Sequence, residues 1–235
     1  MKSIGFMTNL GLTKHAPLAL IGSVLLFFGF FTAAAHAYPG GTYFDHAAAG
    51  HDLWRNTLCD VTRTVAIGGR PNATGCMLAR IGMLSLALGL AVFFTQIPQL
   101  FRARARTGFV VAALGVLAAL GAVGVVLLPS DRFGSAVHGA AVVCAGVPGL
   151  LASLLSLYAL VGVRGVSSLV VVVGLSALSV GAVDFGLYLH ELLSNGQSQL
   201  AVSVLERITT ALLLCWMLAV ARELAPGERS VKPRA

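Results

Sequence analysis

Long apolar segments separated by short polar connections dominate the chain. Six of them reach the length of about 20 mainly apolar residues that a helix needs to cross a bilayer. They cover residues 16–38, 75–98, 107–128, 134–161, 165–189 and 199–222. The pattern predicts an all-α membrane protein, a six-transmembrane-helix bundle that forms one domain over residues 1–225. A polar stretch at 226–235 follows and is expected to be a disordered tail.

One connection is much longer and more polar than the others. Residues 38–75, called the island below, read YPGGTYFDHAAAGHDLWRNTLCDVTRTVAIGGRPNATG. The island holds the acidic residues Asp45, Asp52 and Asp60 and the histidines His46 and His51. A polar segment of this length between two spans predicts an ordered loop on one side of the membrane, acting as a lid or a binding surface.

Composition supports a membrane protein and argues against a nucleic-acid partner. Charged residues make up 11% of the chain, against about 25% in soluble domains, and the mean hydropathy is +0.87. The net charge of +7 would suit nucleic acid, but the basic residues lie at the ends of apolar segments. That placement is typical of membrane topology, so no nucleic-acid role is expected.

The distribution of basic residues predicts the orientation of the bundle. With alternating spans, one face carries Lys2, Lys14, Arg102, Arg104, Arg106, Arg164, Arg222, Arg229, Lys232 and Arg234. The opposite face carries Arg55, Arg63, Arg70 and Arg132, diluted by Asp45, Asp52, Asp60, Asp131 and Glu191. The positive-inside rule then places both termini in the cytoplasm and the island outside. The expected location is the cytoplasmic (inner) membrane.

The first span has a competing interpretation. Lys2 and Lys14 precede an apolar stretch that ends in Ala35-His36-Ala37, which resembles a signal peptide with an A-x-A cleavage site. The apolar part is long for a signal sequence and suits a span, which favours retention.

Ionisable residues inside the spans gather toward the outer face. At a rise of about 1.5 Å per residue, the residues Arg80, His138, Asp184, His190, Glu206 and Arg207 all fall in the outer third of the bilayer. Charges at such depth are costly and usually face the bundle interior. Two interpretations remain open: Asp184 or Glu206 pairs with Arg207 or Arg80 and fixes helix packing, or this layer lines a cavity beneath the island.

Candidate chemistry is less specific. His138, Asp184 and His190 are ligand types suited to zinc, but their spacing matches no metal motif. His36, His138 and His190 are near the level at which a haem would need axial histidines on facing helices, but a haem is not expected. Cys59 and Cys76 both fall on the outer side, where a disulfide is favoured. The catalytic candidates are Asp60 and Glu206, as general bases.

Parts of the chain resemble a known family in their polar pattern. The island residues are Pro39, Gly40, Gly41, Thr42, Asp45, Gly50, Asn56, Asp60, Thr64, Gly69 and Asn72, and the later ones are Pro129, Asp131 and His138. The pattern resembles an uncharacterised prokaryotic multi-pass membrane family, domain-of-unknown-function family 998 (DUF998). The chain departs from it at Cys59, where Ser is usual, and at Val61-Thr62, which replace Leu-Gly. The resemblance implies a multi-pass topology but carries no established activity.

A fainter similarity links residues 54–60 to the alkaline ceramidase and progestin-receptor superfamily of membrane zinc hydrolases. That superfamily has seven spans and a paired His motif, and both are absent from this sequence.

These observations lead to one main hypothesis and two alternatives. The main hypothesis is an outward-facing polar pocket that binds a lipid or amphiphile headgroup, so that membrane lipids are the expected partners. Its ligand-binding residues are Arg80, His138, Asp184, His190, Glu206 and Arg207, with Asn56 and Asp60 from the island. The first alternative is a metal-dependent hydrolase of lipid amides or esters. The second is a structural or accessory subunit, either a homo-oligomer or part of a membrane complex.

Overall fold

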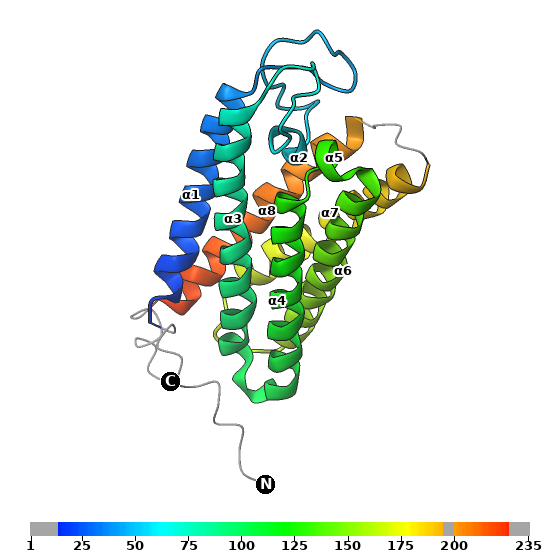
Figure 1. The fold of residues 1–235 in the computed structure, drawn as a ribbon. Helices are drawn as coiled ribbons and strands as arrows, with labels where there is room; N and C mark the ends of the chain where they lie inside the picture. Colours follow the sequence, from blue (N-terminus) through cyan, green and yellow to red (C-terminus); the bar gives the residue numbers. More distant parts are fainter. Residues whose placement is uncertain (1–13, 195–199, 226–235) are drawn as a thin grey trace.

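The structure is a computed structural model that describes residues 14–194 and 200–225, and these residues form an all-helical bundle (Figure 1). The long helices are α1 (Ala16–Ala37), α3 (Ala73–Gln96), α4 (Ala105–Leu127), α6 (Ser135–Leu160), α7 (Ser168–Leu193) and α8 (Leu200–Leu224). The short helices are α2 (Leu58–Val61), α5 (Ser130–Phe133) and the 3₁₀ helix η2 (Ile97–Arg104). The tail predicted at 226–235 lies outside the described residues.

Five helical segments of the described chain are long and apolar enough to cross a membrane. They contain the six predicted spans, because the longest segment, Ala73–Leu127, combines α3 and α4 in 55 residues. This segment folds back at η2, where Phe101 has non-helical dihedrals (φ −132°, ψ 47°), and α3 and α4 run side by side in opposite directions (Figure 1). By helix length and hydropathy, the protein is a multi-pass membrane protein.

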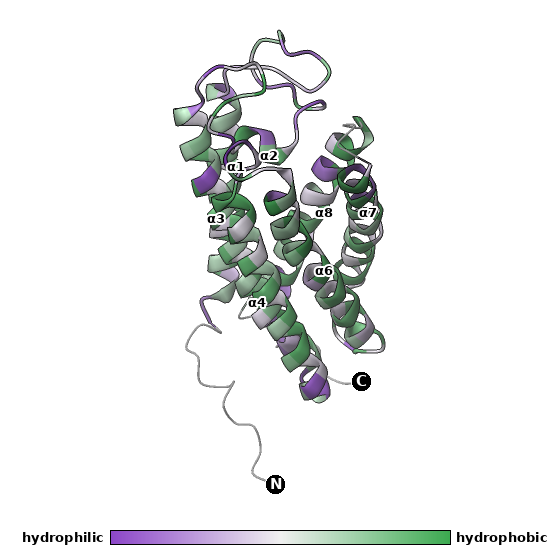
Figure 2. Ribbon diagram, turned by 45° about the vertical axis from the view of Figure 1, so that its right-hand side comes forward, coloured by the Kyte–Doolittle hydropathy of each residue, from purple (hydrophilic) through white to green (hydrophobic). Residues whose placement is uncertain are grey.

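The long helices form a closed ring in chain order. Each one packs on the next, and α8 packs back on α1. Small residues let the helices approach closely, as is common in membranes: a Cβ on Gly121 of α4 would collide with the backbone of Ala145 in α6. Hydrophobic residues cover the lengths of the helices, whereas hydrophilic ones gather in the island and at the helix ends (Figure 2).

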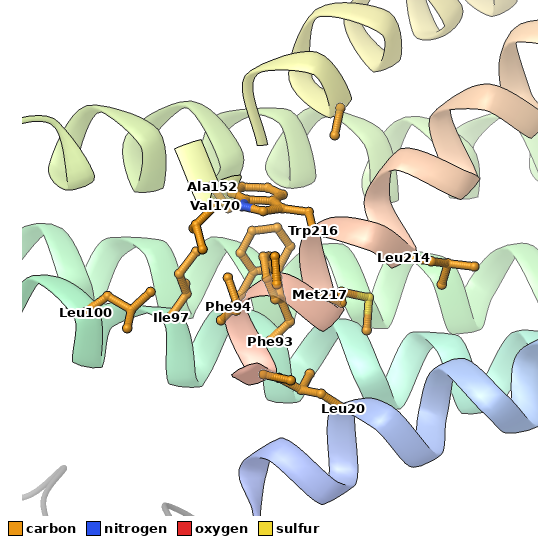
Figure 3. Packing of buried hydrophobic residues seen from close by; sticks show 14 of the residues in the cluster. Leu20, Phe93, Phe94, Ile97, Leu100, Ala152, Val170, Leu214, Trp216 and Met217 are labelled. Atoms are coloured by element: carbon orange, nitrogen blue, oxygen red, sulfur yellow. The ribbon is translucent and has the colours of Figure 1, made fainter. Parts of the chain in front are cut away.

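A large cluster of buried hydrophobic side chains surrounds Trp216, in the half of α8 remote from the island. Its ring meets Phe93 of α3 edge-on, with centroids 4.9 Å apart. Leu20 of α1 and Val170 of α7 belong to the same buried cluster (Figure 3). Because lipid tails are as apolar as these side chains, this packing stabilises the bundle mainly through van der Waals contact. The ring is therefore closed at this level, below the polar layer.

The island is an ordered loop, as predicted, and its backbone is organised by glycine and asparagine. Gly41 adopts φ +93°, and a Cβ there would collide with the backbone of Gly68. Asn56 is fully buried; its side chain donates to the Gly41 carbonyl at 2.9 Å and accepts from the Asp52 N–H at 2.9 Å. Asn72 likewise donates to the carbonyl of Val61 at 3.0 Å. The island therefore satisfies much of its own backbone without a strand.

A carboxylate in α5 fastens one side of the island. Asp131 Oδ2 accepts hydrogen bonds from Thr64 N at 2.8 Å, Thr64 Oγ1 at 2.6 Å and Val65 N at 3.1 Å. Burial alone would raise the pKa of Asp131, but these hydrogen bonds outweigh it and hold the pKa below its usual range. Asp131 therefore fastens the island in its ionised form.

The N-terminal half of α8 fastens the other side of the island. Glu206 Oε2 accepts from the backbone N–H of Leu58 at 2.7 Å. Arg207 donates to the carbonyls of Asn56 at 2.8 Å and Leu53 at 3.3 Å. These charged residues of the outer layer hold the island rather than a neighbouring span. Glu206 and Arg207 lie 3.9 Å apart, which realises one of the predicted ion pairs.

Candidate functional site

Two cavities lie on either side of α8 beneath the island. Glu206 lines one and Arg207 lines the other. Consecutive residues of a helix point about 100° apart, so neighbouring positions can face different cavities. The short helix α2 is divided in the same way, since Leu58 lines the cavity of Arg207 and Cys59 lines that of Glu206.

The first cavity, called the acidic cavity below, has a volume of about 590 Å³. Its ionisable lining consists of Asp60, Asp184, Glu191, Glu206, Cys59, His138, Tyr43 and Tyr188. No Lys or Arg belongs to the lining within the described chain. The structure thus brings together four of the predicted ligand-binding residues, Asp60, His138, Asp184 and Glu206, and they include both catalytic candidates.

Helix α2 presents Asp60 to the acidic cavity through a reciprocal cap. Thr57 accepts from the Asp60 N–H at 3.2 Å, while Asp60 Oδ2 accepts from the Thr57 N–H at 2.8 Å. Asp60 is only 3% exposed, and burial raises its pKa against the lowering effect of these hydrogen bonds. A raised pKa brings Asp60 closer to neutral pH than the pKa of an exposed aspartate, and it therefore suits proton exchange better.

Cys59 is not placed as a nucleophile. Burial raises the pKa of its thiol well above the usual value, and the neighbouring carboxyls of Glu206 and Asp60 raise it further. Because the thiolate is the reactive form, this thiol is expected to be inert. Cys59 and Cys76 are both free in the structure, and Cys76 Sγ donates to the Thr62 carbonyl at 3.0 Å. The predicted disulfide is therefore not formed here.

Two further groups in the acidic cavity differ in how they are satisfied. His138 Nδ1 lies 2.9 Å from the carbonyl oxygen of Leu128. Since a carbonyl only accepts, Nδ1 carries the proton and Nε2 is left as an acceptor. Asp184 Oδ1, in contrast, is buried and has only the Thr209 hydroxyl of α8 near it, outside normal hydrogen-bond geometry within the described chain. A weakly satisfied acceptor of this kind is costly unless a ligand or water also meets it.

The predicted metal and haem ligands are not brought together. No group of three or more His, Cys, Asp or Glu side chains in the described part of the chain is arranged to hold a metal ion. His190 is exposed and lines neither cavity, although His138 and Asp184 share the acidic cavity. His36 lines the opposite cavity, so the histidines considered for haem lie in three different surroundings.

The second cavity, called the α1–α8 pocket below, has a volume of about 460 Å³. Phe27, Phe28 and Phe31 of α1 and Leu214 of α8 supply an apolar wall. His36, His51 and Arg207 supply its basic groups. Its composition is therefore amphipathic, with a long apolar wall and a small basic group.

Arg207 dominates the polar part of the α1–α8 pocket. Its guanidinium lies 5.5 Å from the centre of the Phe31 ring and donates to island carbonyls, yet Nη1 is buried without a hydrogen-bond partner in the described chain. Burial and the nearby Arg207 lower the pKa of His51 to about 4. His51 is thus neutral at pH 7, and its Nε2, 3.4 Å from Arg207 Nη2, acts as the acceptor.

The remaining predicted site residues lie elsewhere. Arg80 lines neither cavity, and its Nε is buried without a partner among the described residues. Asn56 also lines neither, since its amide is used inside the island. Asp184 and Arg207 line different cavities, so the structure does not realise that predicted pair.

Several aromatic residues that line the two cavities were not predicted from the sequence. Phe185 and Tyr188 follow Asp184 on α7, and Tyr43 comes from the island. The spacing of Asp184 and Tyr188 carries a signal, because residues four apart share a helix face. Phe27 and Phe31 of α1 have the same spacing, but in an apolar span it does not distinguish a pocket from a lipid-facing surface.

No protein-family model matches this chain, and neither does any curated protein or solved structure. The similarity of the island to DUF998 therefore stays a prediction.

Proposed function

We propose that this multi-pass membrane protein binds an amphiphile with an anionic headgroup in the α1–α8 pocket. The headgroup meets Arg207 and His51, and the chain lies along the phenylalanines of α1 and along Leu214. The observation that carries the proposal is the buried Nη1 of Arg207 in a largely apolar cavity: it makes no hydrogen bond in the described chain and has only the Glu206 carboxylate, 3.9 Å away, as an ion-pair partner. An anionic oxygen would satisfy it with a charge-assisted hydrogen bond.

The apolar wall supports an amphiphile rather than a small soluble anion. Phe28 is 65% exposed and lines the pocket, so the cavity is bordered by a side chain that faces outward from α1. In a membrane, the outward-facing side of α1 is surrounded by lipid. A ligand with a chain fills such a pocket without stranding apolar surface, whereas a free anion would leave the wall uncovered.

The proposed site opens on the outer side of the cytoplasmic membrane. The basic residues Arg102 and Arg104 lie in η2, at the end of the bundle opposite the island (Figure 1). Arg222 lies in the last turn of α8, which runs toward the same end. The positive-inside rule makes that end cytoplasmic, with the island and both cavities facing outward.

Native mass spectrometry of the full chain, purified in mild detergent, tests the proposal. The wild type should retain anionic lipid above its share in the membrane extract. Ala211→Phe places a ring in the pocket from an exposed position of α8 and should reduce retention by about tenfold, equivalent to about 1.4 kcal/mol. Ala201→Phe, at an exposed α8 position that lines neither cavity, is the matched control.

The charge of the site is tested separately from its shape. Arg207→Lys keeps a cation and should keep the preference for anionic lipid, while Arg207→Gln should lose it. Because Arg207 also holds the island, melting temperatures are measured in parallel. Equal lipid retention by the wild type and Ala211→Phe would overturn the proposal, as would a wild type that carries no excess of anionic lipid.

A further inference from the structure

The acidic cavity has a composition opposite to that of the α1–α8 pocket. Asp60, Asp184 and Glu206 line it, and no Lys or Arg does so in the described chain. Two cations lie near the cavity without lining it: Arg207 is 3.9 Å from Glu206, and Arg63 donates to Tyr43 and Ser130 and offsets part of the charge of Asp60. Asp184 Oδ1 is buried, and the Thr209 hydroxyl of α8 lies near it without reaching normal hydrogen-bond geometry. The cavity therefore presents carboxyls that no Lys or Arg of its described lining neutralises.

The arrangement of the carboxyls does not suit a metal ion. No three metal-ligating side chains of the described residues converge on one point, although a volume of about 590 Å³ separates the walls. A ligand that meets these carboxyls must therefore be larger than a bare ion and contact them at separate places. Pockets of this volume typically hold small organic molecules.

Aromatic rings complete the lining. Tyr43 of the island and Phe185 and Tyr188 of α7 border the same cavity as Asp184. Carboxylates beside aromatic rings are the usual surroundings of an organic ammonium group, because the ring faces attract a cation that sheds its water. The rings also cover the carbon atoms of such a ligand, which a metal ion does not have.

From the cavity, its acidic lining and its rings, we infer that the acidic cavity is a second binding site, for a small organic ammonium compound. Asp184 and Glu206 meet the ammonium group, and Tyr188 and Phe185 border its carbon substituents. The ammonium group belongs either to a free amine or to a lipid headgroup, since the lining recognises the chemistry that both share. This site lies across α8 from the amphiphile site and does not depend on it.

The inference is tested with choline and its uncharged carbon isostere 3,3-dimethylbutanol. Each compound is titrated by calorimetry into the full chain in detergent and amine-free buffer. Choline should bind saturably, and the isostere at least about tenfold more weakly, because it fills the same shape without the charge. Equal binding of the two compounds would overturn the inference.

Asp184→Asn supplies the residue-level test. It keeps the shape of the side chain but removes its charge and should weaken choline binding at least about tenfold while the melting temperature is maintained. Glu223→Gln, on α8 but in neither cavity, should bind like the wild type. Unchanged binding in Asp184→Asn would contradict the inference. Tyr188→Leu, which removes only a ring, should weaken binding less than Asp184→Asn does.

Lipid nanodiscs distinguish the two sources of the ammonium group. Stabilisation by free choline in phosphatidylglycerol nanodiscs would support a free amine, and stabilisation only in phosphatidylcholine or phosphatidylethanolamine nanodiscs would support a headgroup. If none of these conditions stabilises the protein, or if calcium chloride alone does, the inference fails. Anionic-lipid retention, measured on the same samples, reports separately on the α1–α8 pocket.

Discussion

The two cavities beneath the island share a helix but differ in almost every physical property. The α1–α8 pocket is lined by phenylalanines and by Arg207, whereas the acidic cavity is lined by carboxyls, hydroxyls and tyrosines. The opposite charges come from adjacent positions of α8, Glu206 and Arg207. The comparison shows that the two members of an acidic–basic dipeptide can line different cavities although their charges lie 3.9 Å apart, because adjacent helical positions point to different surroundings.

The largest effect is expected at Glu206, because its bond to Leu58 positions α2, which forms a wall of both cavities. Glu206→Ala removes a carboxylate acceptor from a partly buried backbone N–H and should lower the free energy of unfolding by about 1.5–3 kcal/mol. Denaturant or thermal unfolding in detergent measures this loss. Glu223→Ala, whose carboxylate accepts only an exposed N–H from Ser167, should cost much less. Equal losses of unfolding free energy in the two variants would contradict the expectation that Glu206 positions α2.

Filling one cavity at a time should separate the two binding activities. Val142→Phe places a ring in the acidic cavity and should reduce choline binding by about tenfold, leaving lipid retention unchanged. Ala211→Phe should have the reverse pattern. Each overpacking substitution is also expected to cost about 1–3 kcal/mol of stability, so binding is compared below the melting temperature. Loss of both activities in either variant would mean that the cavities act as one.

The comparison extends to pH through His51, which lies only in the α1–α8 pocket. Its pKa of about 4 in the folded protein is below the usual value of about 6.5, so the fold favours the neutral ring. Its contribution to stability is therefore complete above pH 6.5 and is lost as the pH falls toward 4. The melting temperature should fall over this range in the wild type and less steeply in His51→Gln. His46→Gln, at an exposed island position, should follow the wild type.

The smallest effect on stability is expected at Asp184. Among the described residues, its carboxylate has only a weak contact with the Thr209 hydroxyl, and the amide oxygen of Asp184→Asn can still accept from that hydroxyl. We expect the free energy of unfolding to change by less than about 1 kcal/mol. A larger loss, measured by the same unfolding assay, would show that the Asp184 carboxylate holds the helices together rather than serving the cavity.

The helices were predictable from the sequence, because membrane spans follow directly from apolar length. The predicted limits agree with α1, α3, α4, α6 and α8 to within about two residues, as expected for helix ends. Helix α7 extends four residues further than predicted, from 189 to Leu193. His190 and Glu191 therefore continue the helix where their polarity indicated its end.

The sequence predicted the level of the candidate site residues along the helices, but not which side of its helix each residue faces. The sequence indicated that His138, Asp184 and Glu206 lie at one level, and they line one cavity. The rotation of α8 decides which side Arg207 faces, and the apolar pattern around residue 207 is too uniform to fix it. The contacts of the island were equally hidden, because Leu58 meets Glu206 across 148 residues of chain.

That long separation has a consequence for how the protein is made. The island and its short helix are synthesised early, but the groups of α8 that hold them come near the end of the chain. Until α8 has inserted and packed against α1, the ring stays open and neither cavity has its second wall. A ribosome-bound chain that ends before residue 200 should therefore expose the island to proteases, and protection should begin only when the last helix has been inserted.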